Sequence, residues 1–180
     1  MARTVDIEEV REHAEPPSPP PRPVPPSIAV KHALDRVIAA GGLLVMAPVI
    51  AVVALWLRVR GGPVLRREER IGYRGKPLTV RSFAVTEASA VAALPQLWSV
   101  VCGRMSIVGP RPREPGFEAP PARPGLTGLA QLEQLDRWLS VAELLELDER
   151  YARTWSLGLD ARIVLQTFVS SAGGRVRPRP

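Results

Sequence analysis

Basic side chains give this sequence its clearest capacity for chemistry, because arginine and lysine bind phosphate oxygens. They gather in residues 31–81, which hold ten basic and three acidic side chains, whereas residues 1–30 hold three basic and five acidic ones. Such a band attracts anionic lipid head groups, with ~1 kcal/mol per basic residue near the surface, and it also suits a phosphorylated substrate at a membrane. Nucleic acid is a weaker candidate, because no recognition motif lies among the arginines and aromatic residues make up only 5% of the chain.

A disulfide and a cysteine-based metal site are both excluded by composition. The chain has a single cysteine, Cys102, so neither an internal disulfide nor a multi-cysteine zinc site can form. We expect Cys102 to be a partly buried free thiol, and we predict no metal-binding residues.

The elements that must position the basic residues are organised around the uncharged run Val37–Leu57. As a helix, this run would match a hydrocarbon core of ~30 Å at ~1.5 Å per residue. Three arrangements compete: a helix that spans the bilayer, a helix buried in a soluble core, and a re-entrant helix that dips into the bilayer and returns. The rest of the chain is too polar and too short to wrap a core helix, so we expect the protein at a membrane.

Proline and charge favour the re-entrant arrangement. Pro48 removes a backbone hydrogen bond and clashes with the carbonyl of Leu44, so we expect the helix to break at Ala47-Pro48. Basic residues flank both ends of the run, which favours keeping both ends on the cytoplasmic side. The main cost is that backbone groups freed near Pro48 need partners inside lipid.

The N-terminal 30 residues are predicted to be a disordered, Pro-rich leader. Residues 1–15 would form at most a marginal short helix. Pro16–Pro26 holds eight prolines in eleven residues, which indicates an extended linker.

After the apolar run we predict a small cytoplasmic domain, so the fold class is α+β and mainly helical. Pro63–Gly75 and Lys76–Phe83 suggest a hairpin around a glycine turn. Glu87–Val101 suggests a helix kinked or restarted at Pro95, Met105–Val108 a short strand, and residues 113–125 a loop.

Two amphipathic helices are expected near the C-terminus. In Ser140–Thr154, Ser140 is a predicted N-cap and Glu143 completes a capping box. Leu157–Ser170 is the last predicted helix, and residues 175–180 are a loose basic tail.

Between Lys31 and Gly174, short motifs follow one another in an order that resembles the bacterial sugar transferase family, the monotopic phosphoglycosyl transferases that act on polyprenyl phosphate. The matching pieces are Lys31 with Asp35, Ala47-Pro48, Gly62-Pro63-Val64, Arg67, Glu69-Arg70, Gly72, Gly75-Lys76-Pro77, Leu94-Pro95-Gln96-Leu97-Trp98, Gly103, Met105–Pro112, Arg123–Gly128, Leu147-Asp148, Tyr151, Trp155-Ser156-Leu157 and Asp160. The resemblance implies a re-entrant membrane helix over residues 31–60 and a truncated sugar transferase domain over residues 61–174.

The resemblance also implies a reaction and a place for it. Such enzymes transfer a sugar-1-phosphate from a nucleotide diphosphate sugar to polyprenyl phosphate at the cytoplasmic face of the bacterial inner membrane, for exopolysaccharide or glycan precursors. The implied partners are the bilayer, polyprenyl phosphate and the nucleotide sugar. The candidate phosphate-binding residues are Arg111, held between two prolines, then Arg67, Arg70, Lys76 and Arg123. Head-group contact or simple solvent exposure is the alternative for each.

The departures from the family concern catalysis. The family has an Asp-Glu pair before Leu-Pro-Gln-Leu-Trp, in which the Asp is the nucleophile and the pair engages Mg²⁺; here these positions are Ala92 and Ala93. Alanine offers neither a nucleophile nor a metal ligand, so we predict no catalytic residues and no cofactor for this chain. We do not expect Glu87, Glu68 or Glu69 to substitute, because a misplaced nucleophile loses most of its rate.

Further departures surround this pair. The family's Lys-Phe-Arg-Thr-Met run is Ser82–Thr86 here, and only Glu87–Val91 remain of the few dozen residues that normally separate it from the dyad. Gly-Asp-Met has become Gly103-Arg104-Met105, and the usual Trp before Gln131 is Ala130. Two functions stay open: a membrane-bound transferase, or an inactive relative that binds a lipid phosphate or a partner protein.

Overall fold

The computed structural model describes residues 26–85, 90–136 and 138–172. Residues 1–25 of the predicted 30-residue leader, the basic tail and Glu87 lie outside these ranges. The prediction of disorder is wrong for residues 26–30, which begin the helix Pro26–Val59. In the described part, the chain is mixed α and β and mostly helical, with two small sheets.

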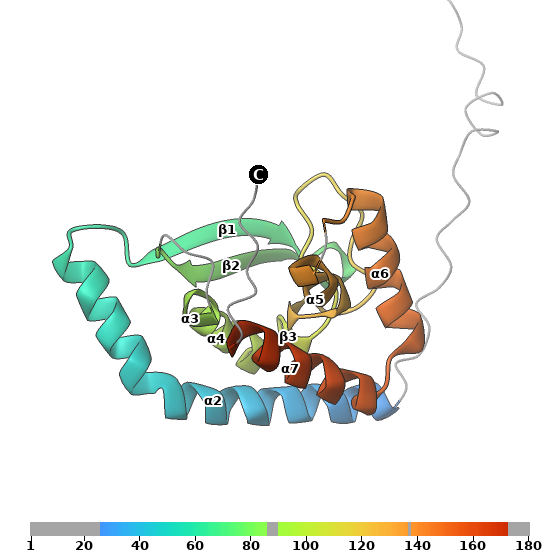
Figure 1. The fold of residues 1–180 in the computed structure, drawn as a ribbon, viewed down its shortest axis with the longest axis horizontal. Helices are drawn as coiled ribbons and strands as arrows, with labels where there is room; N and C mark the ends of the chain where they lie inside the picture. Colours follow the sequence, from blue (N-terminus) through green and yellow to red (C-terminus); the bar gives the residue numbers. More distant parts are fainter. Residues whose placement is uncertain (1–25, 86–89, 137, 173–180) are drawn as a thin grey trace, which may run out of the picture.

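The apolar run lies within one long helix, α2 (Pro26–Val59). Figure 1 shows this helix bent partway along, so that its C-terminal part turns toward strand β1. Pro48 is the one proline inside it, and the backbone hydrogen bond that a proline removes gives the bend a physical cause. The predicted break is therefore a bend in a continuous helix.

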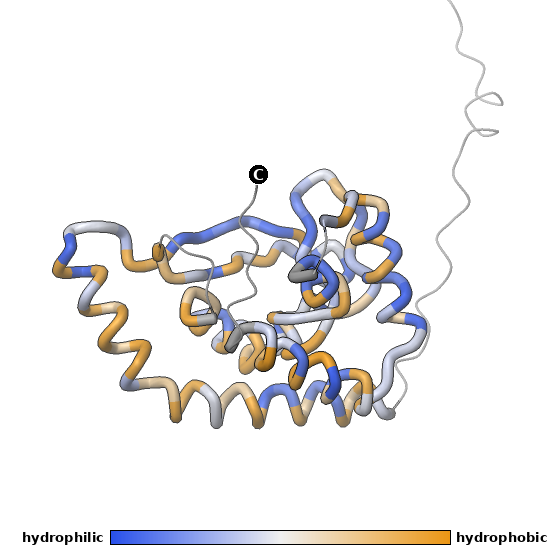
Figure 2. The backbone as a smooth tube through the Cα atoms, viewed as in Figure 1, coloured by the Kyte–Doolittle hydropathy of each residue, from blue (hydrophilic) through white to orange (hydrophobic). Residues whose placement is uncertain are grey.

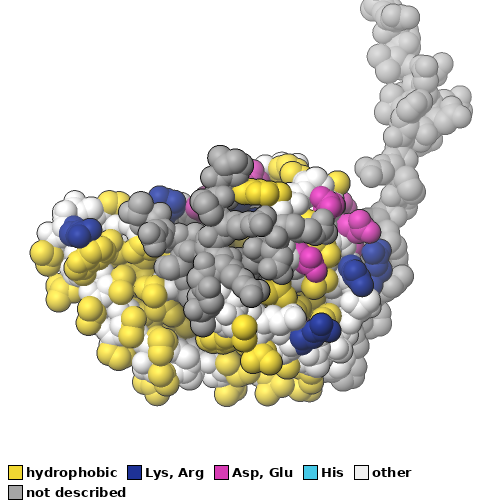
Figure 3. Space-filling model, viewed as in Figure 1, with side chains coloured by type: hydrophobic (Ala, Val, Ile, Leu, Met, Phe, Trp, Pro, Cys, Tyr) yellow, Lys and Arg dark blue, Asp and Glu magenta, His cyan; other side chains and the backbone are white. Residues whose placement is uncertain are grey.

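Helix α2 exposes apolar side chains along most of its length. Leu44 is 78% exposed and Val59 is 79% exposed, and apolar colour follows the helix in Figure 2 and covers the lower edge of the molecule in Figure 3. Residues 27–59 are long and apolar enough to cross a membrane, and only 6% of the most apolar window is buried. The core-helix alternative is therefore wrong.

The predicted hairpin is present. Strands β1 (Leu65–Ile71) and β2 (Pro77–Phe83) pair antiparallel, with Leu65 opposite Phe83 and Ile71 opposite Pro77. The turn between them holds the short 3₁₀ helix η1 (Tyr73–Gly75), in which Arg74 adopts a left-handed φ of 59°. The turn thereby brings Arg74 next to Lys76 at the tip of the hairpin.

The segment after the hairpin restarts at its proline, as predicted. Helix α3 (Ala90–Ala93) leads into the 3₁₀ turn η2 (Leu94–Gln96), and α4 (Leu97–Val101) follows. A first core cluster joins α2, β2, α4 and the residue before β3 through Ala39, Leu78, Val100 and Met105. Cys102, just after α4, is a free thiol but is exposed rather than partly buried.

A second sheet pairs two short strands in parallel. The predicted strand is β3 (Ser106–Val108), and its partner β4 (Gly125–Thr127) begins where we expected a loop to end. The backbones meet closely: a Cβ on Gly125 would lie 2.1 Å from the Gly109 nitrogen and 2.4 Å from the Thr127 oxygen. Glycine is required at position 125 because backbone atoms occupy the space of a side chain.

Three helices complete the domain. The sequence analysis missed α5 (Leu129–Asp136) but predicted α6 (Val141–Thr154) and α7 (Leu157–Ala172). The capping box of α6 is confirmed: the Glu143 N–H donates to the Ser140 hydroxyl, and the Ser140 N–H donates to the Glu143 carboxylate. A second core cluster joins β3, α6 and α7 through Val108, Tyr151 and Ile163.

We expect Gly125→Ala to lower the free energy of unfolding by roughly 2–3 kcal/mol, because the added methyl group must displace backbone atoms of both strands. The measurement is chemical denaturation of the detergent-solubilised protein, followed by circular dichroism. Gly41→Ala is the matched control, because a Cβ there meets nothing within 4 Å, and alanine favours a helix by about 1 kcal/mol over glycine. Equal destabilisation by both substitutions would contradict the close approach at Gly125.

Candidate functional site

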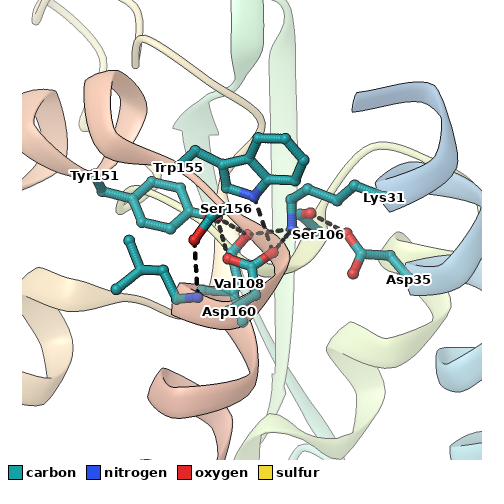
Figure 4. Close-up of polar contacts among 9 residues, drawn as sticks. Lys31, Asp35, Ser106, Val108, Tyr151, Trp155, Ser156 and Asp160 are labelled. Atoms are coloured by element: carbon teal, nitrogen blue, oxygen red, sulfur yellow. Dashed lines mark hydrogen bonds and ion pairs between the residues drawn. The ribbon is translucent and has the colours of Figure 1, made fainter. Parts of the chain in front are cut away.

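A buried polar cluster joins the N-terminal part of α2 to the rest of the domain (Figure 4). The Lys31 ammonium donates to Asp160 at 2.7 Å, to Asp35 at 3.2 Å and to the carbonyl oxygen of Val108 at 3.1 Å. Lys31, Asp35 and Asp160 are each at least 90% buried. One ammonium group therefore lies between two carboxylates, one from its own helix and one from α7.

Neutral side chains complete this cluster. The Tyr151 hydroxyl lies 2.7 Å from Asp160 and 3.0 Å from the Val108 oxygen, and the Trp155 indole N–H donates to Asp160 at 3.1 Å. The Ser106 hydroxyl donates to Asp35. Burial, together with the charge of Asp160, raises the pKa of Tyr151, so its phenol stays neutral. These residues belong to the quoted motifs, but the sequence analysis assigned no role to them.

A basic cavity of about 610 Å³ lies beside the hairpin turn. Four cationic side chains line it: Arg74, Lys76, Arg104 and Arg123. Arg36 reaches the same region from α2, because a Cβ on Gly103 would lie 2.3 Å from its guanidinium nitrogen. Burial, and next the charge of Arg36, lower the pKa of Arg123. The cavity is thus a site of concentrated positive charge.

Two of the five predicted phosphate-binding residues, Lys76 and Arg123, meet in this cavity. The sequence analysis missed Arg74, Arg104 and Arg36 as members of the same site. One signal was available, because Arg104 stands where the family has the Asp of Gly-Asp-Met. The positive φ of Arg74 and the reach of Arg36 to Gly103 had no such signal in the sequence.

Arg111 is bound elsewhere. Its backbone N–H donates to Asp148 at 3.2 Å, and its guanidinium donates to Gln134 at 3.0 Å. Burial raises the pKa of Asp148 to about 6. These contacts anchor the Pro110-Arg111-Pro112 segment to α5 and α6, and Arg111 does not line the basic cavity.

The two other predicted arginines lie on β1. Arg70 pairs with Glu68 at 2.8 Å and with Glu114 at 2.9 Å, and the hydrogen bond that Arg70 donates to Glu68 raises the pKa of Arg70. Arg67 is exposed. Glu68 thus pairs with an arginine of the hairpin, whereas Glu69 accepts a hydrogen bond from the Thr79 hydroxyl.

The positions of the family's acidic pair, Ala92 and Ala93, lie at the end of α3. Their methyl side chains have no oxygen that could bind Mg²⁺ or attack a phosphate. Within the described ranges, no group of three or more His, Cys, Asp and Glu residues could hold a metal ion. The residues at this place therefore do not fit the family's Mg²⁺.

The order of these elements and the motifs that build the cluster define a class of protein. The chain belongs to the bacterial sugar transferase family, whose family model matches residues 26–92 and 84–174.

Individual relatives come from several bacteria. The chain is 34% identical to the UDP-glucose:undecaprenyl-phosphate glucose-1-phosphate transferase of Caulobacter vibrioides, over 81% of this chain and 72% of the relative. It is 30% identical to the enzyme of the same name from Escherichia coli strain K12, over 79% of this chain and 41% of the relative. It is also 30% identical to the exopolysaccharide production protein PSS of Rhizobium leguminosarum bv. phaseoli, over 79% of this chain and 95% of the relative. The chain thus spans well under half of the Escherichia coli protein.

The alignments also bear on the predicted missing residues. The match to the Caulobacter relative runs over 191 residues while covering only 81% of this 180-residue chain, so that relative carries residues that have no counterpart here. The two stretches matched by the family model overlap at residues 84–92. This overlap ends at Ala92 and includes Glu87–Val91, the short stretch in which the sequence comparison with the family's motifs predicts the loss.

We expect Lys31→Met to lower the free energy of unfolding by about 3–5 kcal/mol, because it leaves the carboxylates of Asp35 and Asp160 buried without their cation. The measurement is urea denaturation in detergent, followed by tryptophan fluorescence. Arg58→Met is the control, since Arg58 is an exposed cation at the other end of the same helix. Similar stability of the two variants would show that the Lys31 cluster does not hold α2 to the domain.

Proposed function

We propose that the function class of this chain is that of its family, the transfer of a sugar-1-phosphate from a nucleotide diphosphate sugar to polyprenyl phosphate for exopolysaccharide or glycan precursors. We also propose that this chain on its own does not catalyse that transfer. The relatives' names support the reaction class, since they specify UDP-glucose, undecaprenyl phosphate and exopolysaccharide production. The observation that carries the proposal is the alanine pair at positions 92–93, inside a domain that keeps many of the family's other motifs.

The loss of turnover follows from the chemistry of the missing groups. A covalent step needs a nucleophile within bonding distance of the phosphorus of the sugar phosphate, and the nucleoside monophosphate that leaves needs fixed positive charge or a metal. Alanine supplies neither group. The remaining hairpin carboxylates are engaged, Glu68 by Arg70 and Glu69 by Thr79, so neither is poised as a substitute.

Membrane attachment in a re-entrant form is the second part of the proposal. Residues 31–60 form the membrane helix and residues 61–174 the truncated domain. The support is geometric: Lys31, before the apolar run, is bound to α7, while β1 begins six residues after the end of α2. Its partner β2 places Leu78 against Ala39 and Val100. Both ends of the apolar run therefore contact the same domain. A spanning helix would place its two ends on opposite sides of the bilayer and would have to break one of these sets of contacts.

Flanking charge supports the cytoplasmic face. Basic residues lie at both ends of the apolar run, with Lys31 and Arg36 before it and Arg58 and Arg60 after it. The positive-inside rule favours the cytoplasmic side for each end. The exposed apolar side chains of α2 would then lie in the inner leaflet and its head-group region.

We expect the purified protein, reconstituted with polyprenyl phosphate and Mg²⁺, to transfer no label from nucleotide sugars to lipid and to trap none on itself. The measurement is thin-layer chromatography of the lipid fraction, with gel autoradiography of the protein. Label found in either place would overturn the proposed lack of turnover while leaving the reaction class intact.

Restoring the acidic pair tests the remaining scaffold. We expect the double substitution Ala92→Asp with Ala93→Glu to recover little activity, because the residues that precede the pair in the family are also missing. A relative with an intact acidic pair is the positive control for the substrates. Recovery to within about tenfold of that control would show that the alanines are the only defect.

We expect cysteines placed at both ends of the apolar run to react only from the cytoplasmic side. The design uses Ala29→Cys or Gly62→Cys in a Cys102→Ser background, with a membrane-impermeant maleimide applied to intact spheroplasts and to inverted vesicles. Labelling of the two positions from opposite sides would establish a spanning helix and defeat the re-entrant form.

A further inference from the structure

A groove of about 720 Å³ lies between α5, α6 and α7, apart from the basic cavity beside the hairpin turn. Each of the three helices contributes apolar side chains to it, among them Leu132, Leu147 and Leu159. Leu165 and Val169 of α7 also line the groove, and each of them is 65% exposed. Large apolar side chains left open in this way are typical of an interaction surface.

The groove is too polar to be covered by the interior of a bilayer. Seven of its lining residues are apolar, and the other six are polar or charged. Burying charged side chains in hydrocarbon without partners is costly. A polypeptide segment with an apolar stripe and charged flanks matches such a lining, as amphipathic helices do when they bind in grooves.

The charge of the groove is mainly positive. Two arginines line it, Arg150 and Arg162, against one acidic residue, Glu133. Within the described ranges, neither arginine forms an ion pair. A segment that covers the groove therefore needs acidic side chains beside its apolar stripe.

The N-terminal residues of this chain have that composition. Residues 1–15 hold five acidic and two basic side chains. Ile7, Val10 and Ala14 follow the i, i+3, i+7 spacing that places apolar side chains on one face of a helix. A helix this short is marginal on its own, so it needs a partner surface to be stable.

The point where this segment joins the domain lies beside the groove. Helix α2 begins at Pro26, five residues before Lys31, whose ammonium is bound to Asp160 of α7. Asp160 directly follows Leu159, which lines the groove. Figure 1 shows the start of α2 next to the connection between α6 and α7. The chain before Pro26 therefore starts from one end of the groove.

A tether of this length makes a weak contact effective. Residues 16–25 are rich in proline and can extend to about 31 Å at ~3.1 Å per residue. The groove follows α7 only from Leu159 to Ser170, which is about 16 Å of helix. A short tether keeps its segment at an effective concentration in the millimolar range. The apolar stripe can then dock, although a separate peptide of the same sequence would bind weakly.

The groove and the segment differ in their relation to the family. The family model matches from residue 26 onward, so residues 1–25 lie outside the matched part of the chain. The helices that form the groove lie inside it. A contact between the two is therefore not part of what the family match describes.

We propose that residues 5–14 dock as a short amphipathic helix in the groove between α5, α6 and α7. Ile7, Val10 and Ala14 face the apolar side chains of the groove, and acidic residues of the segment lie beside Arg150 and Arg162. This contact involves neither turnover nor the bilayer, so it does not depend on the proposed function.

The test measures the distance between two spin labels by double electron–electron resonance, with the full chain in lipid nanodiscs. Labels are attached at Glu8→Cys and Glu146→Cys in a Cys102→Ser background; Glu146 is exposed on α6 and lines none of the cavities described. We expect a narrow distance distribution, because docking fixes the segment against α6. A broad distribution would overturn the proposal, since the groove would then be open or covered by something else.

Substitutions in the segment identify the docked face. We expect Ile7→Ser with Val10→Ser to lower the ratio of docked to free segment by about tenfold, which broadens the distribution. The matched control is Val5→Ser with Val24→Ser, because Val5 lies about 140° around a helix from Val10 and Val24 lies in the linker. We expect this control to keep the narrow distribution. Equal behaviour of the two double variants would overturn the proposal.

Substitutions in the groove test its charge. We expect Arg150→Gln with Arg162→Gln to broaden the distribution, because the acidic residues of the segment lose their partners. Arg66→Gln with Arg67→Gln removes the same charge from β1, where both arginines are exposed and line none of the cavities described. Equal broadening by both pairs would overturn the placement of the segment in this groove, because only the net charge of the protein would matter.

Dilution separates docking within one chain from docking between two copies. Labelled protein is mixed with an excess of unlabelled protein before reconstitution, and we expect the narrow distribution to remain. Its loss on dilution would overturn the proposal, because the segment would then occupy the groove of a second copy.

Discussion

The contact on which the rest of the structure depends is that of the Lys31 ammonium with the buried carboxylates of Asp35 and Asp160. Each charge alone would be costly to bury, and the cluster is tolerable because Tyr151 and Trp155 donate hydrogen bonds to Asp160 and Ser106 donates one to Asp35. One ammonium cannot neutralise two carboxylates, so negative charge remains. The negative charge of Asp35 also acts on Arg123 in the basic cavity. There it raises the Arg123 pKa, whereas burial and the charge of Arg36 lower it. The cluster that holds the membrane helix thus also stabilises a nearby cation.

This cluster restricts how the chain meets a bilayer. It fixes the N-terminal part of α2 against β3, α6 and α7, and the packing of Ala39 on Leu78 fixes the next turns against the hairpin. The bend near the middle of α2 (Figure 1) turns the remaining apolar part back toward β1. The helix therefore has little freedom to straighten across a membrane without separating the hairpin from the domain. In the proposed re-entrant form, the exposed apolar edge of α2 would lie in one leaflet and both sets of contacts would be kept.

Local signals predicted most of the elements, and the misses come from contacts between distant segments or from a weak local pattern. The hairpin turn, the restart at Pro95 and the capping box of Ser140 with Glu143 each depend on a few neighbouring residues, so the sequence was sufficient. Strand β4 has three residues and exists because its glycine backbone approaches Gly109, which no periodicity reveals. Helix α5 was missed because it is short and its apolar residues do not form a clear stripe. In the site, Arg111 fits the chemistry of phosphate binding, but its contacts with Asp148 and Gln134 place it elsewhere.

The substitutions that set this chain apart from its family follow a pattern in charge. Around the acidic pair, the resemblance implies the loss of two cations, at Ser82 and Ala84, and of two anions, at Ala92 and Ala93. These losses leave the net charge of the region unchanged but remove four charged groups that could stabilise the charge that develops in a transition state. At the basic cavity the change goes the other way, because Arg104 replaces an aspartate and adds to the positive charge of Arg74, Lys76 and Arg123. Fixed cations can bind an anion equally tightly in the ground state and in the transition state. Such binding raises the affinity for the anion but does not accelerate the chemical step. The pattern of substitution therefore supports the proposed lack of turnover.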